Sequence, residues 1–252
     1  IIDAAVQAHA RGVQLLLTPE LALCGYAAED LFLRPAFIDA CDHALNDILQ
    51  GTAHLKGLHL VVGHPARQSN IALRGRSVAV AGLYNAASVL TEGRVVARHA
   101  KRELPNYQVF DERRYFVPGH EACVVPVPDA QGRPVKVGLL ICEDAWFDAP
   151  AADCKAAGAE LLAVINASPF HAGKGGERED TMRQRARSTG LPLIYAHLVG
   201  GQDEIVFEGR SFVLDAGGVL AGRAVSFEEA AFDMRFERAE AGWRIQAETD
   251  RA

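Results

Sequence analysis

The chain has 252 residues, 49% of them hydrophobic, and its formal net charge at pH 7 is -6. The excess of acidic residues and the lack of any Lys- or Arg-rich run argue against a nucleic-acid-binding surface. No apolar stretch of the sequence approaches the roughly 20 residues that a membrane-spanning helix needs. The composition leaves small neutral or cationic molecules as candidate partners.

Five cysteines are scattered along the sequence without a CxxC pair, and their number is odd. In a chain of this length, that pattern favours free thiols and a reducing compartment over a disulfide framework, so we predict a cytoplasmic protein. The histidines form neither an HExxH motif nor an i, i+4 pair, so we predict no metal site. The cysteines are Cys24, Cys41, Cys123, Cys142 and Cys154.

The first half of the chain is predicted to alternate helices and strands. Helical spacing of apolar residues indicates the helices, and short apolar runs bounded by Gly or Pro indicate the strands. Because the sequence opens inside a helix that lacks a capping residue, we expect that a preceding strand is missing. The predicted elements are a helix at 2–10, a strand at 13–18, a helix at 35–51, a strand at 58–63, a surface loop at 67–76 and a hairpin of strands 84–90 and 95–99.

The second half begins with a long irregular segment, 101–119, which is rich in aromatic and charged residues. Long irregular segments inside compact domains are usually functional or disordered, and the aromatic residues favour function. The elements predicted after it are a hairpin of strands 123–127 and 135–141, a helix at 150–157, a strand at 160–165, a loop at 171–176, a helix at 177–189, a strand at 193–198, a loop at 200–204 and a hairpin of strands 212–215 and 219–223.

Helices and strands alternate in this prediction, but several neighbouring strands are joined by tight hairpins. Hairpins join antiparallel strands, whereas parallel strands need longer crossovers. The pattern therefore predicts an α/β fold of mixed sheets with helices on their outer faces. From residue 237 the sequence alternates charged and small residues, and we interpret residues 237–252 as a linker.

Three polar residues each follow a predicted strand: Glu20, Lys101 and Cys142. If the strands are neighbours, Glu20 could accept the proton of the Cys142 thiol. Lys101, helped by the backbone N–H of Glu143, could then stabilise a tetrahedral oxyanion. Taken singly, each residue has an ordinary structural role: a helix cap for the glutamate, a solvated strand end for the lysine and core packing for the cysteine.

A pairing of the cysteine with a histidine is an alternative way to activate the thiol. His99 and His197 also lie at predicted strand ends, although neither has a marked polar context. The group of glutamate, lysine and cysteine supplies a nucleophile, a base and an oxyanion donor together, which no other grouping in the sequence does as economically.

The segments around these residues resemble the nitrilase, or carbon–nitrogen hydrolase, superfamily, whose members carry a Glu-Lys-Cys triad in a four-layer αββα sandwich of two mixed sheets. More narrowly, the chain is similar to the glutaminase domain of glutamine-dependent NAD synthetases, from the first helix to about residue 236. The segments at 104–107 and 200–204 are the most specific. The matching segments are Pro19-Glu20, Lys101 to Tyr107, Val109 to Glu112, Ile141 to Asp144, Asn166 to Pro169 and Gly200 to Glu204.

The resemblance implies a catalytic triad of Glu20, Lys101 and Cys142. In such a triad the glutamate accepts a proton, the lysine supports the intermediate and the cysteine forms a glutamyl thioester while ammonia leaves. The resemblance also implies that the fold lacks its first strand, which leaves one sheet short of an inner strand. The further residues that it implies at the glutamine site are Tyr107, Glu112, Glu143, Ser168 and Lys174.

Three of these implied contacts have equally simple structural interpretations. Tyr107 could pack inside a rigid loop, Ser168 could cap a turn, and the side chain of Lys174 could be solvated. The sequence alone leaves these alternatives open.

The resemblance further implies a division of labour along a longer polypeptide. Residues 1–236 would form the glutamine amidohydrolase domain, and 237–252 would lead to an ATP-dependent synthetase domain that uses the ammonia to convert deamido-NAD to NAD. The Ser-Gly-Gly-x-Asp-Ser loop of that second domain does not occur in this sequence. We therefore expect no cofactor for this domain, with ATP and magnesium bound only by the synthetase domain. The expected partners are L-glutamine, the synthetase domain and further copies in a homo-oligomer.

Two other functions are compatible with the same residues. A stand-alone nitrilase-type amidase would use the same triad on another small amide. A non-catalytic interaction module would support a synthetase partner or an oligomer and would form no thioester. Substrate profiling separates the first function from a glutaminase, and covalent labelling of the cysteine separates the second.

Overall fold

The computed structural model describes residues 1–68, 82–240 and 242–247. Within them, two larger sheets have the strand orders β1-β2-β3-β4 and β12-β11-β8-β7-β6-β5, and two further hairpins are β9–β10 and β13–β14. Both larger sheets combine parallel with antiparallel neighbours. The elements are α1 (Ile2–Ala10), β1 (Leu15–Leu17), η1 (Glu29–Leu33), α2 (Pro35–Gly51), β2 (His59–Arg67), β3 (Leu83–Thr91), β4 (Arg94–Ala100), η2 (Glu112–Arg114), β5 (Cys123–Pro128), β6 (Pro134–Ile141), η3 (Cys142–Trp146), α3 (Asp148–Ala156), β7 (Leu161–Asn166), α4 (Lys174–Thr189), β8 (Leu193–His197), β9 (Val199–Gln202), β10 (Ile205–Glu208), β11 (Phe212–Leu214), β12 (Leu220–Arg223), β13 (Met234–Ala239) and β14 (Gly242–Ala247).

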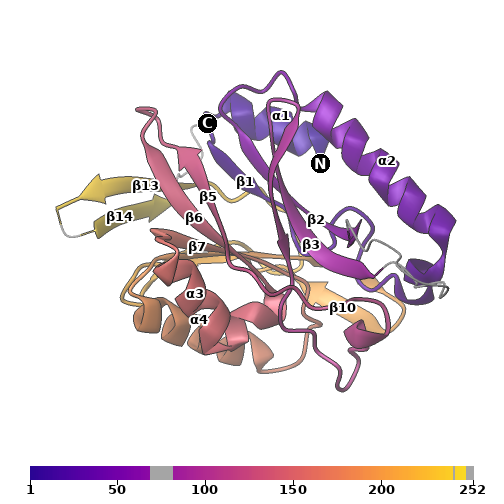
Figure 1. Ribbon diagram of the computed structural model, residues 1–252. Helices are drawn as coiled ribbons and strands as arrows, with labels where there is room; N and C mark the ends of the chain where they lie inside the picture. Colours follow the sequence, from indigo (N-terminus) through magenta and orange to yellow (C-terminus); the bar gives the residue numbers. More distant parts are fainter. Residues whose placement is uncertain (69–81, 241, 248–252) are drawn as a thin grey trace.

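Alternation of side chains along the strands divides the core into layers, because successive residues of a strand face opposite sides of its sheet. In β2, Leu60 and Val62 pack with residues of α1 and α2, whereas Val61 packs against the second sheet. In β7, Leu162 and Val164 pack with residues of α3 and α4. The result is a four-layer αββα sandwich, with one helix pair on each outer face (Figure 1). This architecture confirms the predicted fold class.

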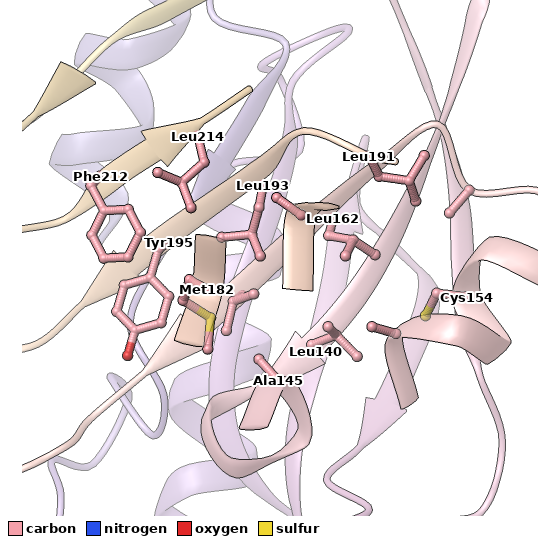
Figure 2. Packing of buried hydrophobic residues seen from close by; sticks show 14 residues of the cluster. Leu140, Ala145, Cys154, Leu162, Met182, Leu191, Leu193, Tyr195, Phe212 and Leu214 are labelled. Atoms are coloured by element: carbon pink, nitrogen blue, oxygen red, sulfur yellow. The ribbon is translucent and has the colours of Figure 1, made fainter. Parts of the chain in front are cut away.

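The core layer beneath α3 and α4 also holds the turn that follows the predicted nucleophile. Figure 2 shows the ring of Tyr195 stacked on that of Phe212, with 4.7 Å between the ring centroids, and Met182 of α4 close by. Ala145 of η3 and Cys154 of α3 are fully buried in the same cluster. The packing of this layer therefore anchors η3 to the sheet and to the helices that cover it.

The directions of the strands explain why the predicted site residues meet. Strands β1, β2 and β4 run the same way, since β1 pairs in parallel with β2 and β3 is antiparallel to both β2 and β4. Strands β6, β7 and β8 are parallel to one another. Glu20 and Lys101 follow β1 and β4 of the first sheet, and Cys142 and Ser168 follow β6 and β7 of the second. The site is therefore assembled from the carboxyl ends of strands in both sheets.

Two segments that were predicted to be irregular form hairpins instead. Residues 200–204 belong to the hairpin β9–β10. Part of the segment that was expected to be a linker, residues 237–239 and 242–247, belongs to the antiparallel pair β13–β14, which projects from one side of the sandwich (Figure 1). Trp243 packs against the apolar layer between the sheets, and Arg238 lies over its ring. Residues 69–76 of the predicted surface loop and residues 248–252 of the predicted linker lie outside the described residues.

Gly63 in β2 allows the segment that carries Glu20 to pack directly on the sheet. A Cβ added at this position would lie 2.4 Å from the carbonyl oxygen of Pro19 and 2.6 Å from the nitrogen of Leu21. The Gly63 carbonyl also accepts a hydrogen bond from the Leu23 N–H at 3.1 Å. We expect Gly63→Ala to lower the free energy of unfolding by about 1–3 kcal/mol, because the chain must move away from the added methyl group.

Urea unfolding of the variant and of a matched control measures this effect. Gly176 in α4 is the control position, since a Cβ there would meet no other atom within 4 Å. Gly176→Ala should be neutral or should stabilise the protein by up to about 1 kcal/mol. Equal unfolding free energies for Gly63→Ala and the unmodified protein would contradict the prediction.

Two kinds of feature are absent from the part of the chain that the structure describes. No helix in it is both long enough and apolar enough to cross a membrane. No group of three or more His, Cys, Asp or Glu side chains in it is arranged to hold a metal ion.

Candidate active site

Lys101 lies between two carboxylates at the centre of the site. Its Nζ is 2.7 Å from Glu20 Oε1 and 2.7 Å from Glu112 Oε1. Asn85 Nδ2 donates to Glu20 Oε1 at 2.7 Å and lies 3.5 Å from Glu112 Oε2. The hydroxyl of Tyr26 donates to Glu112 Oε1 at 2.8 Å. Glu112, predicted as the second glutamate of the site, is thus bonded directly to the lysine.

Backbone groups hold Glu20 and Lys101 in place. The N–H of Ala167, which follows β7 of the second sheet, donates to Glu20 Oε2 at 3.0 Å. The backbone N–H of Lys101 donates to the carbonyl of Asn85, and its carbonyl accepts from the N–H of Gly119, each at 2.8 Å. Glu20 and Lys101 are both 0% exposed. Water therefore does not screen the ion pair, and the hydrogen bond from Ala167 to Glu20 links the two sheets.

The two carboxylates keep the buried lysine charged. Burial alone lowers the pKa of a lysine, but the charges of Glu112 and Glu20 outweigh it and raise the pKa of Lys101 well above its ordinary value. The pKa of Glu112 is itself raised, mainly by burial and also by the charge of Glu20, although Lys101 opposes this shift. At neutral pH, Lys101 is therefore an ammonium group shared by two carboxyl groups.

Cys142 directly follows β6 and is the first residue of η3. Its φ is +47°, which is uncommon for a residue other than glycine, and the residue is 2% exposed. Backbone conformations of this kind cost about 1–3 kcal/mol and cluster at functional sites. The Sγ atom lies 3.7 Å from the hydroxyl oxygen of Ser168. The prediction that the strand stops at this cysteine and the chain then turns is confirmed.

The thiol of Cys142 is protonated in this environment. Burial and then the negative charge of Glu20 raise its pKa well above the ordinary value, and the opposing effect of the Lys101 ammonium does not compensate. A protonated thiol is a weak nucleophile, so attack by this sulfur requires a base. Ala167, whose N–H donates to Glu20, and Ser168, whose hydroxyl lies beside the thiol, are consecutive residues, so the segment after β7 contacts both the glutamate and the cysteine.

Ser168 is held in position by partners on β7 and β8. Its Oγ lies 3.1 Å from the side-chain amide of Asn166. Its backbone N–H donates to His197 Nε2 at 3.1 Å, and His197 Nδ1 lies 2.6 Å from the carbonyl of Gly209. Burial, together with the charge of Arg178, lowers the pKa of His197 to about 4. A neutral histidine that donates from Nδ1 and accepts at Nε2 satisfies both contacts.

Neither histidine of the alternative cysteine–histidine arrangement makes a hydrogen bond to the thiol within the described residues. His197 bonds to the backbone of Ser168. The Nε2 of His99 is 2.8 Å from Asp144 Oδ2. The geometry therefore favours the group of glutamate, lysine and cysteine over a cysteine–histidine pair.

Tyr107 and Glu143 form a second polar pair next to the nucleophile. The Tyr107 hydroxyl donates to Glu143 Oε1 at 2.8 Å, and its ring packs edge-to-face on Phe110 with 5.6 Å between centroids. Tyr107 is 47% exposed, so this pair lies at the solvent side of the buried lysine and carboxylates. Lys174 begins α4, and its side chain lies outside the described part of the structure, so its contact with a substrate stays a prediction.

The sequence analysis missed three buried polar residues at the site, Tyr26, Asn85 and Asp144. Asn85 had a detectable signal, since an asparagine within a strand of small and apolar residues must find buried partners. Asp144 had a detectable signal too, as an acid three residues beyond the end of a buried strand. Tyr26 had none, because its partner Glu112 is distant in sequence.

Two packed mixed sheets with outer helices, together with a buried cysteine, lysine and glutamate at their strand ends, define an α/β sandwich of the nitrilase type. The sequence profile of the Carbon-nitrogen hydrolase family matches residues 1–240. The chain belongs to this family.

Several relatives of this chain are glutamine-dependent NAD(+) synthetases. The chain is 45% identical over 215 residues to that of Xanthomonas campestris pv. campestris (strain 8004), with 84% of this chain and 36% of the relative covered. It is 42% identical over 237 residues to that of Rhodobacter capsulatus, with 94% and 40% covered. The glutamine-dependent NAD+ synthetase from Acinetobacter baumannii, solved in complex with ADP, matches with a TM-score of 0.83 and 32% identity, covering 99% of this chain and 44% of that one. The chain thus spans less than half the length of these relatives.

Another similar structure is an amidase of the nitrilase superfamily from Nesterenkonia sp. AN1. A variant of it matches with a TM-score of 0.71 and 26% identity, covering 89% of this chain and 78% of that one. In a further structure of the amidase, in which a glutamate is replaced by glutamine, the acetamide moiety of fluoroacetamide is covalently added at the active-site cysteine. The amidase and the synthetase share the sandwich of the present chain.

Proposed function

We propose that this chain is a glutaminase domain, which hydrolyses the side-chain amide of L-glutamine to glutamate and ammonia through a thioester on Cys142. The observation that carries the proposal is the buried ion pair of Glu20 and Lys101, which the segment after β7 connects to the buried thiol of Cys142: the N–H of Ala167 donates to Glu20, and the hydroxyl of Ser168 lies 3.7 Å from the thiol sulfur. These groups are the nucleophile, the base and the cation that acyl transfer from an amide requires.

In the first half of the proposed reaction, Glu20 takes the proton of Cys142 as the sulfur attacks the amide carbon of glutamine. A C–S bond forms, and the electron pair of the carbonyl moves onto its oxygen. The ammonium of Lys101 and the backbone N–H of Glu143 stabilise this oxyanion. Glu20 then gives its proton to the amide nitrogen, the C–N bond breaks, and ammonia leaves a glutamyl thioester behind.

The second half of the proposed reaction replaces sulfur with water. Glu20 takes a proton from a water molecule as the water oxygen adds to the thioester carbon. The oxyanion forms again beside Lys101, the C–S bond breaks, and the thiolate regains its proton from Glu20. Glutamate is released and Cys142 returns to its protonated state. In this scheme, Glu112 balances the charge of Lys101 throughout both halves.

Charge complementarity supports glutamine as the amide. A free amino acid carries an ammonium and a carboxylate at its α-carbon. Glu143, bonded to Tyr107 at the solvent side of the site, offers a carboxylate for the ammonium. Lys174 is the predicted partner of the α-carboxylate, and the hydroxyl of Ser168 beside the thiol is a candidate contact for the reacting amide.

The relatives extend the proposal to a longer polypeptide. We propose that residues 1–236, together with the hairpin β13–β14, form the glutaminase domain, that the rest of 237–252 connects it to a synthetase domain, and that this second domain uses the ammonia with ATP and magnesium to convert deamido-NAD to NAD. Support comes from relatives that carry the name glutamine-dependent NAD(+) synthetase and are more than twice as long as the matched segment. A homo-oligomer and a cytoplasmic location belong to the same proposal.

Ammonia release by the complete natural polypeptide tests the proposal. Glutamine, asparagine and propionamide are supplied in parallel, and hydroxylamine is added to capture a glutamyl thioester as its hydroxamate. Because one methylene changes specificity by about 10-fold to 200-fold, glutamine should be cleaved at least about tenfold faster than asparagine. Faster cleavage of propionamide than of glutamine would identify the chain as a stand-alone amidase. If the protein releases no ammonia and forms no hydroxamate, the chain is a non-catalytic module.

A further inference from the structure

Asp144 is a fully buried carboxylate whose two oxygens receive hydrogen bonds from both halves of the site. Its Oδ1 accepts the backbone N–H groups of Arg102 at 2.8 Å and Glu103 at 2.9 Å, directly after Lys101. Its Oδ2 accepts the backbone N–H of Ile141 at 3.0 Å, directly before the nucleophile.

A fourth hydrogen bond reaches Asp144 from the strand that leads to the lysine. His99 Nε2 lies 2.8 Å from Asp144 Oδ2, and His99 is 1% exposed. His99 precedes Lys101 by two residues on the strand β4 and its end, and Asp144 follows Cys142 by two residues in η3. A single carboxylate, two residues after the cysteine, therefore accepts hydrogen bonds from residues on either side of the lysine and from the residue directly before the cysteine.

Asp144 accepts these four hydrogen bonds as an ionised carboxylate. Burial acts to raise its pKa, but the hydrogen bond and charge of His99 and the backbone N–H groups of Glu103 and Ile141 lower it below the ordinary value. An ionised carboxylate binds N–H groups more strongly than a neutral acceptor does. It also opposes relaxation of the backbone at Cys142, whose φ of +47° must be held by its surroundings.

We propose that Asp144 is a positioning residue, which sets the distance between the thiol of Cys142 and the ammonium of Lys101 by tying η3 to the loop after β4. The expected effect on turnover rests on the proposed function. The expected effect on the positions of Cys142 and Lys101 does not. Displacement of reacting groups by about 1 Å can cost on the order of 10²-fold in rate. Loss of this carboxylate should therefore slow the reaction more than it weakens binding of the amide.

The substitution Asp144→Asn tests the proposal in the complete natural polypeptide. Asparagine keeps the size of the side chain but places an NH₂ group where at least one N–H now donates to an oxygen. The turnover number should fall about 100-fold, while KM for glutamine changes by less than about threefold. A matched control is Asp153→Asn, since Asp153 also contacts Arg102, 2.8 Å from its Nη1, but lies exposed at the surface. This control should leave both kinetic constants unchanged.

Alkylation of Cys142 by iodoacetamide separates failure of this inference from failure of the proposed function. The reaction is followed on the peptide that contains Cys142, so it needs no glutamine turnover. Asp144→Asn should be alkylated at least about tenfold more slowly than the unmodified protein and Asp153→Asn, because the thiol no longer faces its base and cation. Equal alkylation rates in folded protein would overturn the positioning role, whether or not glutamine is cleaved.

A pair of substitutions at His99 keeps the test decisive if Asp144→Asn does not fold. His99→Ala removes one of the four hydrogen bonds and should lower the alkylation rate several-fold, by about threefold or more. His99→Gln places an amide N–H near the position of Nε2 and should restore most of the rate. A rate for His99→Ala equal to that of the unmodified protein, or no recovery in His99→Gln, would contradict the proposal.

Discussion

Replacement of Cys142 by alanine should abolish glutamine hydrolysis, with a fall in turnover on the order of 10⁴-fold or more, while the protein stays folded. The sulfur is the atom that forms and breaks the bond to the acyl group in the proposed reaction. Alanine keeps the Cβ, so the turn at φ +47° needs no new conformation. Ammonia release measured with excess enzyme checks the prediction. Near-normal turnover in this variant would contradict the thioester mechanism.

Cys154→Ala is the matched control for this experiment. Cys154 is as deeply buried as Cys142, but it lies in the core layer beneath α3 and α4 (Figure 2). Both substitutions remove one sulfur from a buried place, so each should cost about 1 kcal/mol of unfolding free energy. Only the change at Cys142 should remove activity. Equal losses of activity in the two variants would mean that packing, and not chemistry, explains the effect.

Lys101→Met should lose both activity and stability. Methionine has a side chain of similar length without the charge, so two buried carboxyl groups, Glu20 and Glu112, are left without their cation. Removal of one partner from a buried ion pair typically costs about 3–5 kcal/mol. Loss of the ammonium at the oxyanion should in addition lower turnover by about 10²-fold to 10³-fold. Urea unfolding and ammonia release measure the two effects.

The stability deficit of Lys101→Met should depend on pH in a defined direction. The pKa of Glu112 is already raised by burial and by Glu20, and Lys101 holds it down. Without the lysine it rises further, and a carboxyl group with a raised folded-state pKa destabilises the protein once pH exceeds its unfolded value of about 4.3. The deficit should therefore be largest at about pH 7.5 and should shrink as pH falls toward about 5. A deficit that grows on acidification would contradict the charge argument.

Lys136→Met provides the control for charge removal. Lys136 lies on β6 with an exposed side chain, and its backbone N–H, which bonds to Glu160, is unchanged by the substitution. The unfolding free energy should stay within about 0.5 kcal/mol of the unmodified protein at both pH values. Turnover should not change either. A comparable loss in this variant would show that the measurement responds to net charge and not to the buried network.

Local signals in the sequence were sufficient for much of the fold. The helix predicted at 35–51 is α2 (Pro35–Gly51), because Pro at the first turn and an amphipathic pattern are both local features. The hairpin β3–β4 follows from its turn at 91–94. The positions of Glu20, Lys101 and Cys142 just beyond apolar strands were also detectable, and in the structure Glu20 and Lys101 form a buried ion pair, while their joint catalytic role with Cys142 stays a prediction.

Non-local contacts explain what the sequence did not reveal. The strand β14 forms in a polar tail because Trp243 finds an apolar layer made by other segments of the chain. The hairpin β9–β10 contains glycines that give no strand signal, and its pairing depends on the β8 end from which it departs. Asn85 gains its role only when β3 brings it to Glu20 and Glu112, which are distant in sequence.

Because the proposed site is assembled from two sheets, the apolar layer between them sets its geometry. Glu20 and Lys101 follow strands of one sheet and Cys142 follows a strand of the other, so side chains such as Val61 and Val137 act as spacers between base and nucleophile. Packed sheets lie about 10 Å apart, and a smaller spacer allows them to approach. In the proposed reaction, the volume of this core would therefore set how closely the two halves of the site approach each other.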